Sequence, residues 1–131
     1  EGLAVFPYNA IGAGLLTGKY LRGESGRLQE AEMYRQRYEN PQYVEVTRRF
    51  VEYAAQNKVS PAALAVAWVM AHPAITAPII GARNIEQFHD TLHCIDMELN
   101  DEERAAITAL SIEPASATDR ESMDAMKKRG W

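Results

Sequence analysis

The sequence predicts an α/β fold built on a parallel sheet, and three features of its hydrophobic pattern support this. Two short apolar runs, at 3–6 and 75–80, predict strands that alternate with helical patterns. The first run is apolar at every position, which is typical of a strand covered by helices on both faces. Residues 62–71 are also all apolar. A helix at 62–71 would therefore have no solvent face and would have to be covered by other elements.

Helix-start signals define the middle of the chain. Pro41 is expected to open a helix, and Ser60 and Pro61 combine an N-cap with proline at the first helical position. The pair His72-Pro73 is expected to end this second helix. In the first helix, the apolar positions expected to share one face are Val44, Phe50, Val51 and Ala54.

Two more helices are predicted by capping signals. Asn84 caps a helix to about residue 93, with Gln87 at the reciprocal capping-box position, and Asn100 with Glu103 repeats this for a helix to about residue 110. Residues 21–35 are polar and contain glycines, which predicts a loop with a helical turn and a length typical of functional loops. The polar tail at 113–131 is expected to hold a short helix at 120–128.

Two strands are too few for an independent sheet, because each would leave an unpaired edge. The chain also opens at Glu1 without an initiator Met and enters an apolar run almost at once. We therefore expect residues 1–131 to be one fragment of a longer protein, whose missing strands complete the sheet.

The composition of the 131 residues is that of a globular protein. The hydrophobic fraction is 47% and the formal net charge is −4, which gives no reason to expect nucleic acid or an acidic membrane as a partner. Neither a membrane-spanning apolar run nor a secretory signal is visible. The single cysteine, Cys94, excludes an internal disulfide and favours a cytoplasmic location.

The segment around Gly81 has the pattern of an anion site. A predicted strand leads to this glycine, where backbone can approach a ligand, and a helix N-terminus with free N–H groups follows. Arg83 adds a planar donor fork suited to a phosphate monoester such as the 2′-phosphate of NADP. The same segment is also compatible with an ordinary capped helix beside an exposed arginine.

A second candidate unit lies at 7–20. Tyr8 follows a predicted strand and could stack on a flat ring, and glycine-rich backbone and Lys19 come next. The alternative is a tight turn with Tyr8 in the core. In (β/α)8 barrels, phosphate sites often form from the loops after strands seven and eight. Two such loops on one chain match that arrangement.

Three motifs resemble the aldo-keto reductase family. The run PYNAIGAGLLTGKY at 7–20 resembles the family's P-Y-S-P-L-x-x-G-L-L-T-G-K-Y, and SPAALAVAWV at 60–69 resembles its S-P-A-Q-L-A-L-A-W-V. The run PIIGARNIEQ at 78–87 resembles its eighth-strand cofactor motif. The resemblance is closest to the branch of bacterial general reductases and potassium-channel β subunits. It implies that residues 1–131 are the C-terminal part of a (β/α)8 TIM barrel, comprising strands 7 and 8 with their helices.

The resemblance also implies an NADP site on the loops 7–19 and 81–91. Tyr8 would stack on the nicotinamide, and the 2′-phosphate would lie on Gly81, Arg83 and Gln87. The pyrophosphate would be lined by Asn9, Ile11, Gly12, Ala13 and Lys19, with Arg27 reaching it from the following loop. Asp90 and Thr91 would lie near the adenine. The sequence departs from the family pattern where Asn9 replaces Ser, Ala10 replaces Pro, and Asp90-Thr91 replaces Glu-Asn.

The implied activity is reduction of an aldehyde or ketone by hydride transfer from NADPH. The family's catalytic Asp, Tyr, Lys and His have no counterpart in these 131 residues, so we assign no catalytic residue and expect the fragment alone to be inactive. The expected partners are the remainder of its own barrel and a small carbonyl substrate. The alternative is a non-catalytic NADPH-binding regulatory subunit similar to potassium-channel β subunits. His89 and His93 imitate a zinc motif, but without Glu after the first His we predict no metal site.

Overall fold

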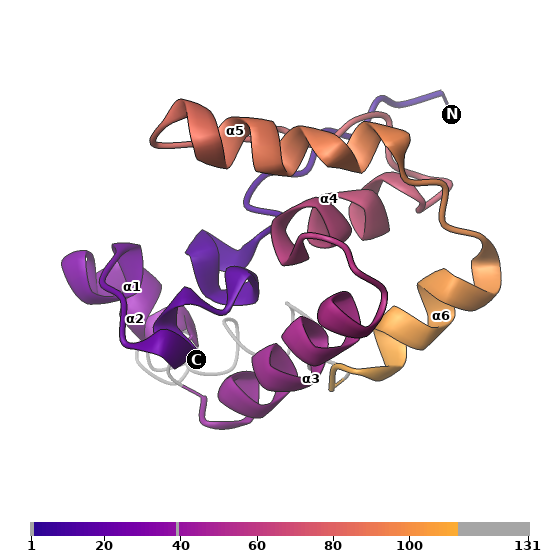
Figure 1. Cartoon of the computed structure of the whole chain (residues 1–131). Coiled ribbons are helices and arrows are strands. Elements are labelled where there is room, and N and C mark those ends of the chain that lie inside the picture. Colours follow the sequence, from indigo (N-terminus) through magenta and orange to yellow (C-terminus); the bar gives the residue numbers. More distant parts are fainter. Residues whose placement is uncertain (1, 39, 113–131) are drawn as a thin grey trace, which may run out of the picture.

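The computed structural model describes residues 2–38 and 40–112 (Figure 1). The described part is helical, and its longest helix is α3 (Gln42–Gln56). The other elements, in chain order, are η1 (Gly12–Thr17), η2 (Lys19–Arg22), α1 (Arg27–Glu30), α2 (Glu32–Tyr38), α4 (Pro61–Met70), α5 (Ile85–Leu92), η3 (His93–Asp96) and α6 (Asp101–Ala109). None of the described helices is long and apolar enough to cross a membrane. The tail at 113–131, with the helix expected at 120–128, lies outside the described residues.

Helix α4 is central to the packing, as its all-apolar sequence predicts. It lies between α5 on one side and α3 and α6 on the other (Figure 1), and it also contacts η1 and η3. Ala62 to Ala67 are all buried. Neighbouring elements therefore bury the first two turns of α4, as its apolar sequence predicts.

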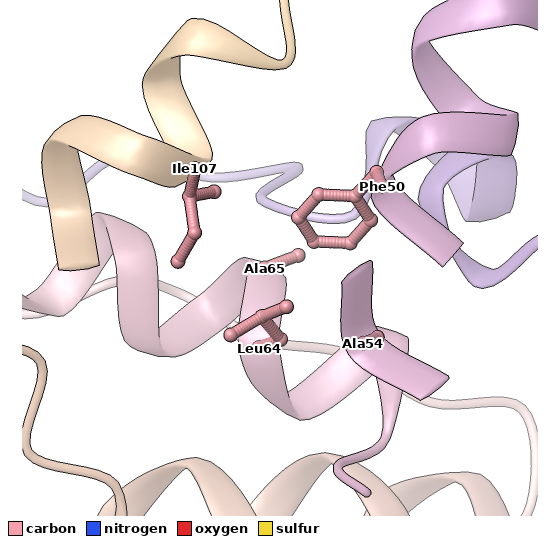
Figure 2. Packing of buried hydrophobic residues seen from close by; sticks show 5 residues of the cluster. All are labelled: Phe50, Ala54, Leu64, Ala65 and Ile107. Carbon is pink, nitrogen blue, oxygen red and sulfur yellow. The ribbon is translucent and has the colours of Figure 1, made fainter. Parts of the chain in front are cut away.

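Two apolar clusters meet at α4. In the first, Leu64 and Ala65 pack against Phe50 and Ala54 of α3 and Ile107 of α6, and Figure 2 shows these side chains converging. The second lies on other faces of α4, where Ala63, Val66 and Ala67 pack with Cys94 of η3. Burial raises the pKa of the Cys94 thiol, which fits its role as a small hydrophobe. Ile11 packs against both clusters, so the 7–19 loop is anchored to the core.

The predicted helix starts are confirmed. The Ser60 hydroxyl accepts hydrogen bonds from the N–H groups of Ala62 and Ala63 (3.2 and 3.4 Å). Asn100 and Glu103 form the full capping box, with both bonds at 2.9 Å, and the first turn of α6 is acidic. On α3, Phe50 and Ala54 are buried as predicted, but Val44 is 46% exposed and Thr47 takes the buried place instead.

The predicted strands at 3–6 and 75–80 are not formed as regular strands. Within the described residues they are represented by one parallel bridge, between Tyr8 and Ile79. The two segments still run side by side, since the Thr76 N–H donates to the Val5 carbonyl (2.9 Å) and the Ile79 N–H to the Pro7 carbonyl (2.8 Å). Two paired segments are too few for an extended ladder. Their apolar side chains remain exposed to solvent, with Leu3 79% and Ile79 58% exposed.

The expectation of a loop at 21–35 is also wrong in part. The single turn of α1 agrees with the helical turn expected there, but most of α2 also lies in this region, after Ala31. A local bond supports the first turn, because the Gly26 N–H donates to the Gln29 side chain at 2.9 Å. Gly23 and Gly26, which are expected to break a helix, both precede α1, so the interior of this helix contains no glycine.

Candidate cofactor-binding site

An open pocket of about 610 Å³ lies where the 7–19 loop, the start of α4 and the 79–91 segment meet. This volume is in the range typical of small-molecule sites. Every residue predicted for the cofactor site lines this pocket except Gly12. The lining residues from that prediction are Tyr8, Asn9, Ile11, Ala13, Lys19, Arg27, Gly81, Arg83, Gln87, Asp90 and Thr91.

Tyr8 stands at the pocket with its ring exposed. Within the described residues it is 71% exposed and belongs to neither apolar cluster. The backbone bridge to Ile79 fixes Tyr8 beside the second segment of the pocket. An aromatic face anchored in this way is available for stacking on a planar group.

Asn9 shapes the turn that follows. Its φ of 64° lies in the left-handed region, which Asn tolerates better than most residues. The Asn9 carboxamide oxygen accepts from the Ala13 N–H (2.7 Å), and its NH₂ group donates to the Tyr38 hydroxyl (2.8 Å). Burial raises the pKa of Tyr38. The departure from the family's Ser at this position therefore has a structural reason, because Asn9 links the loop to α2.

Lys19 is packed across the glycines of its own loop. A Cβ added at Gly14, whose φ is 91°, would lie 2.8 Å from Lys19 Cε. The Lys19 ammonium lies 4.8 Å from the centre of the Tyr20 ring, and the Tyr20 hydroxyl donates to the Ala13 carbonyl (3.0 Å). These contacts hold the lysine beside the pocket, and the left-handed φ of Gly14 is the reason for a glycine there.

The 81–91 segment presents a helix N-terminus to the pocket. Asn84 accepts from the Gln87 N–H (2.9 Å), as predicted for the N-cap of α5. The reciprocal half of the predicted capping box is shifted by one residue, because the Gln87 side chain accepts from the Arg83 N–H (3.2 Å). A Cβ added at Gly81 would meet no atom within 4 Å. Packing within the described residues therefore does not explain why Gly81 is a glycine.

Arg83 extends from this helix start to Glu30 at the end of α1. Its guanidinium donates to both carboxylate oxygens, Nη2 to Oε2 at 2.7 Å and Nη1 to Oε1 at 3.5 Å. Both side chains are about half exposed. The hydrogen bond from Arg83 is the main cause that lowers the pKa of Glu30 below its usual value. The arginine predicted to bind phosphate thus already holds an anion of the protein.

Asp90 and Thr91 are engaged with neighbouring groups. The Ser60 hydroxyl donates to Asp90 Oδ2 at 2.6 Å, which joins the start of α4 to α5. The Thr91 hydroxyl donates to the Gln87 carbonyl (2.8 Å), and Thr91 is only 7% exposed. These bonds give both residues a structural role at the positions where the family pattern is not kept.

Several pocket residues were missed by the sequence prediction. Thr17, Arg22, Tyr34 and Ser60 also line the pocket. The S-P motif revealed Ser60 only as a helix cap, and Arg22 and Tyr34 lie in the region expected to be a loop. The basic side chains at the pocket are Lys19, Arg22, Arg27 and Arg83, against Glu24 and Asp90 as acidic ones. Among the residues with described positions, no three His, Cys, Asp or Glu side chains gather as metal ligands would.

Comparison with known proteins places this chain in a family. The sequence profile of the Aldo/keto reductase family matches residues 1–112. The chain belongs to the aldo/keto reductase family. The family has a (β/α)8 barrel, and the parallel pairing of Val5 and Pro7 with Thr76 and Ile79 is compatible with adjacent barrel strands.

Individual aldo/keto reductase relatives are similar over most of this chain. The uncharacterized oxidoreductase YrpG of Bacillus subtilis is 33% identical over 106 residues, which are 77% of this chain and 30% of that protein. The protein tas of Escherichia coli is 28% identical over 112 residues, 84% of this chain and 32% of that protein. An aldo-keto reductase of Babesia bovis is 33% identical over 98 residues, which are 71% of this chain and 34% of that protein. The chain thus spans about a third of the length of these relatives.

Proposed function

We propose that this chain is the NADP-binding part of an oxidoreductase that reduces aldehydes or ketones. The observation that carries the proposal is the convergence of two loops, 7–19 and 81–91, on one pocket with basic side chains. An exposed aromatic ring, glycine-rich backbone, a helix N-terminus and an arginine fork together are suited to a nicotinamide dinucleotide. Family membership supports the same assignment.

Each part of the cofactor has a suitable partner in the pocket. The exposed Tyr8 ring would stack on the nicotinamide. Lys19 and Arg27 would neutralise the pyrophosphate beside Ile11 and Ala13. Arg83 would hold the 2′-phosphate. The open space beside Gly81 supports this fit, because a ligand could approach the backbone there without displacing protein atoms. When bound, the cofactor supplies the hydride.

The adenine end of the site rests on Asp90 and Thr91. The bond from Ser60 holds the Asp90 carboxylate at the start of α4, so this group would accept from the adenine amino group only through its remaining lone pairs. Thr91 would contribute packing, because its hydroxyl already bonds to Gln87. Gly12 does not line the pocket and is left out of the proposed site.

The remaining parts of the reaction would come from outside these residues. We propose that the paired segments at 3–8 and 75–80 are strands seven and eight of a barrel, and that the rest of the barrel covers the exposed Leu3 and Ile79. That part would carry the proton donor for the carbonyl oxygen, because this chain contains no counterpart of the family's catalytic set. We place the protein in the cytosol, where NADPH is available and Cys94 stays reduced.

An activity assay tests this function. The complete polypeptide that carries this sequence is expected to oxidise NADPH when an aromatic or aliphatic aldehyde is added, whereas the 131 residues alone are expected to show no turnover. NADPH consumption followed by absorbance, with NADPH-only and aldehyde-only blanks, measures both. Turnover by the pure 131 residues would contradict the assignment of no catalytic residue to this chain. NADPH binding without turnover by the complete polypeptide would favour the regulatory-subunit alternative.

A further inference from the structure

The ion pair between Glu30 and Arg83 joins two segments that are 53 residues apart in sequence. Glu30 is the last residue of α1, and Arg83 immediately precedes the N-cap of α5. Both terminal nitrogens of Arg83 contact the carboxylate, so the fork is filled by Glu30. Arg83 lines the pocket, and the pair therefore lies at its edge.

The Nη1–Nη2 edge of a guanidinium can hold one bidentate anion at a time. A phosphate monoester carries a charge of about −2 near neutral pH, and it prefers the same planar donors as a carboxylate does. For a 2′-phosphate to use the Nη1–Nη2 edge of Arg83, the Glu30 carboxylate has to leave, and a phosphate on the Nε edge would lie beside that carboxylate. Once displaced, Glu30 remains close by and repels the phosphate, since both groups are anionic. A cofactor with a 2′-hydroxyl meets neither cost and can bind while the ion pair stays intact.

We propose that Glu30 sets the cofactor preference of this site by competing with the 2′-phosphate for Arg83. This inference rests on the proposed NADP-binding function and adds a selectivity residue to it. Glu30 acts through Arg83 and is therefore a positioning residue. Glu30 reduces the difference between the affinities for NADPH and NADH. When NADH is bound, the intact ion pair still links α1 to the start of α5.

The expected size of the effect follows from the exposure of the pair. Because Glu30 and Arg83 are about half exposed, water and salt screen their attraction. Removing such a competitor and its repulsion is expected to strengthen NADPH binding about threefold to fivefold at low salt. NADH binding is expected to stay within about twofold, because the 2′-hydroxyl does not need Arg83.

The test compares Glu30→Gln with wild type in the complete polypeptide that carries this sequence, by fluorescence titration with NADPH and with NADH. Glu32→Gln is the matched control, since Glu32 is a similarly exposed carboxylate two residues away whose partner Arg35 (3.3 Å) does not line the pocket. The proposal predicts that only Glu30→Gln raises the ratio of NADPH to NADH affinity. A general disturbance of α1 would weaken both cofactors together and leave this ratio unchanged.

The outcomes distinguish a failure of the proposed role of Glu30 from a failure of the proposed NADP-binding function. An unchanged ratio in Glu30→Gln, or an equal rise in Glu32→Gln, overturns the role of Glu30 and leaves the proposed function standing if wild type binds NADPH. If wild type binds neither cofactor, the proposed function fails and this inference fails with it. Glu30→Ala, which cannot bond to Arg83 as glutamine can, is expected to raise the ratio at least as much as Glu30→Gln.

Discussion

Replacing Arg83 by alanine is expected to weaken NADPH binding about tenfold to a hundredfold, because the guanidinium would make charge-assisted hydrogen bonds to the 2′-phosphate. The substitution removes the guanidinium that would hold the 2′-phosphate and leaves Glu30, an anion, beside it. NADH binding is expected to change by less than about twofold, since no other part of the cofactor is assigned to this side chain. Fluorescence titration with each cofactor measures both constants.

Arg35→Ala is the control for the loss of one positive charge. Arg35 is a similarly exposed arginine that pairs with Glu32, and it does not line the pocket. It should leave both affinities nearly unchanged. Equal weakening of NADPH and NADH by Arg83→Ala would contradict the assignment, because it would place Arg83 on a part that the two cofactors share.

Truncating Phe50 to alanine is expected to lower the free energy of unfolding by about 3–5 kcal/mol. Phe50 is only 5% exposed and packs with Leu64 and Ile107, so its removal leaves a cavity where α3, α4 and α6 meet (Figure 2). The same cluster supports Ile11 of the 7–19 loop. We therefore expect weaker cofactor binding as a secondary effect.

Urea denaturation of the complete polypeptide, followed by circular dichroism, checks this prediction. Val44→Ala on the same helix is the control, because Val44 is 46% exposed and should cost less than about 1 kcal/mol. A loss below about 1 kcal/mol for Phe50→Ala as well would show that the contact between α3 and α4 contributes little to stability.

Helix boundaries could be predicted from the sequence because their signals are local. Ser60, Asn84 and Asn100 each cap a helix through bonds to residues two or three positions away. The strands could not be assigned in the same way, since a strand depends on partners distant in sequence and this chain offers each segment one neighbour. Helix α2 was missed because most of its residues are polar and form no clear apolar stripe.

The site could be predicted as far as its motifs extend. Tyr8, Lys19, Gly81 and Arg83 were proposed from two separate runs, and the structure gathers these runs around one pocket. The contacts that fix individual side chains were not predictable. The bonds from Asn9 to Tyr38 and from Ser60 to Asp90, and the Glu30–Arg83 pair, span 29 to 53 residues. No periodicity or capping rule encodes such pairings.

The central claim is that the pocket between the two loops binds a dinucleotide through its 2′-phosphate. Titration of the unmodified complete polypeptide with NADPH and NADH at low and high salt tests it most directly. We predict that NADPH binds more tightly than NADH. The ratio of the two affinities is expected to fall as the salt concentration rises, because the contact to Arg83 is electrostatic and partly exposed. Equal affinities for NADPH and NADH at low salt would contradict it.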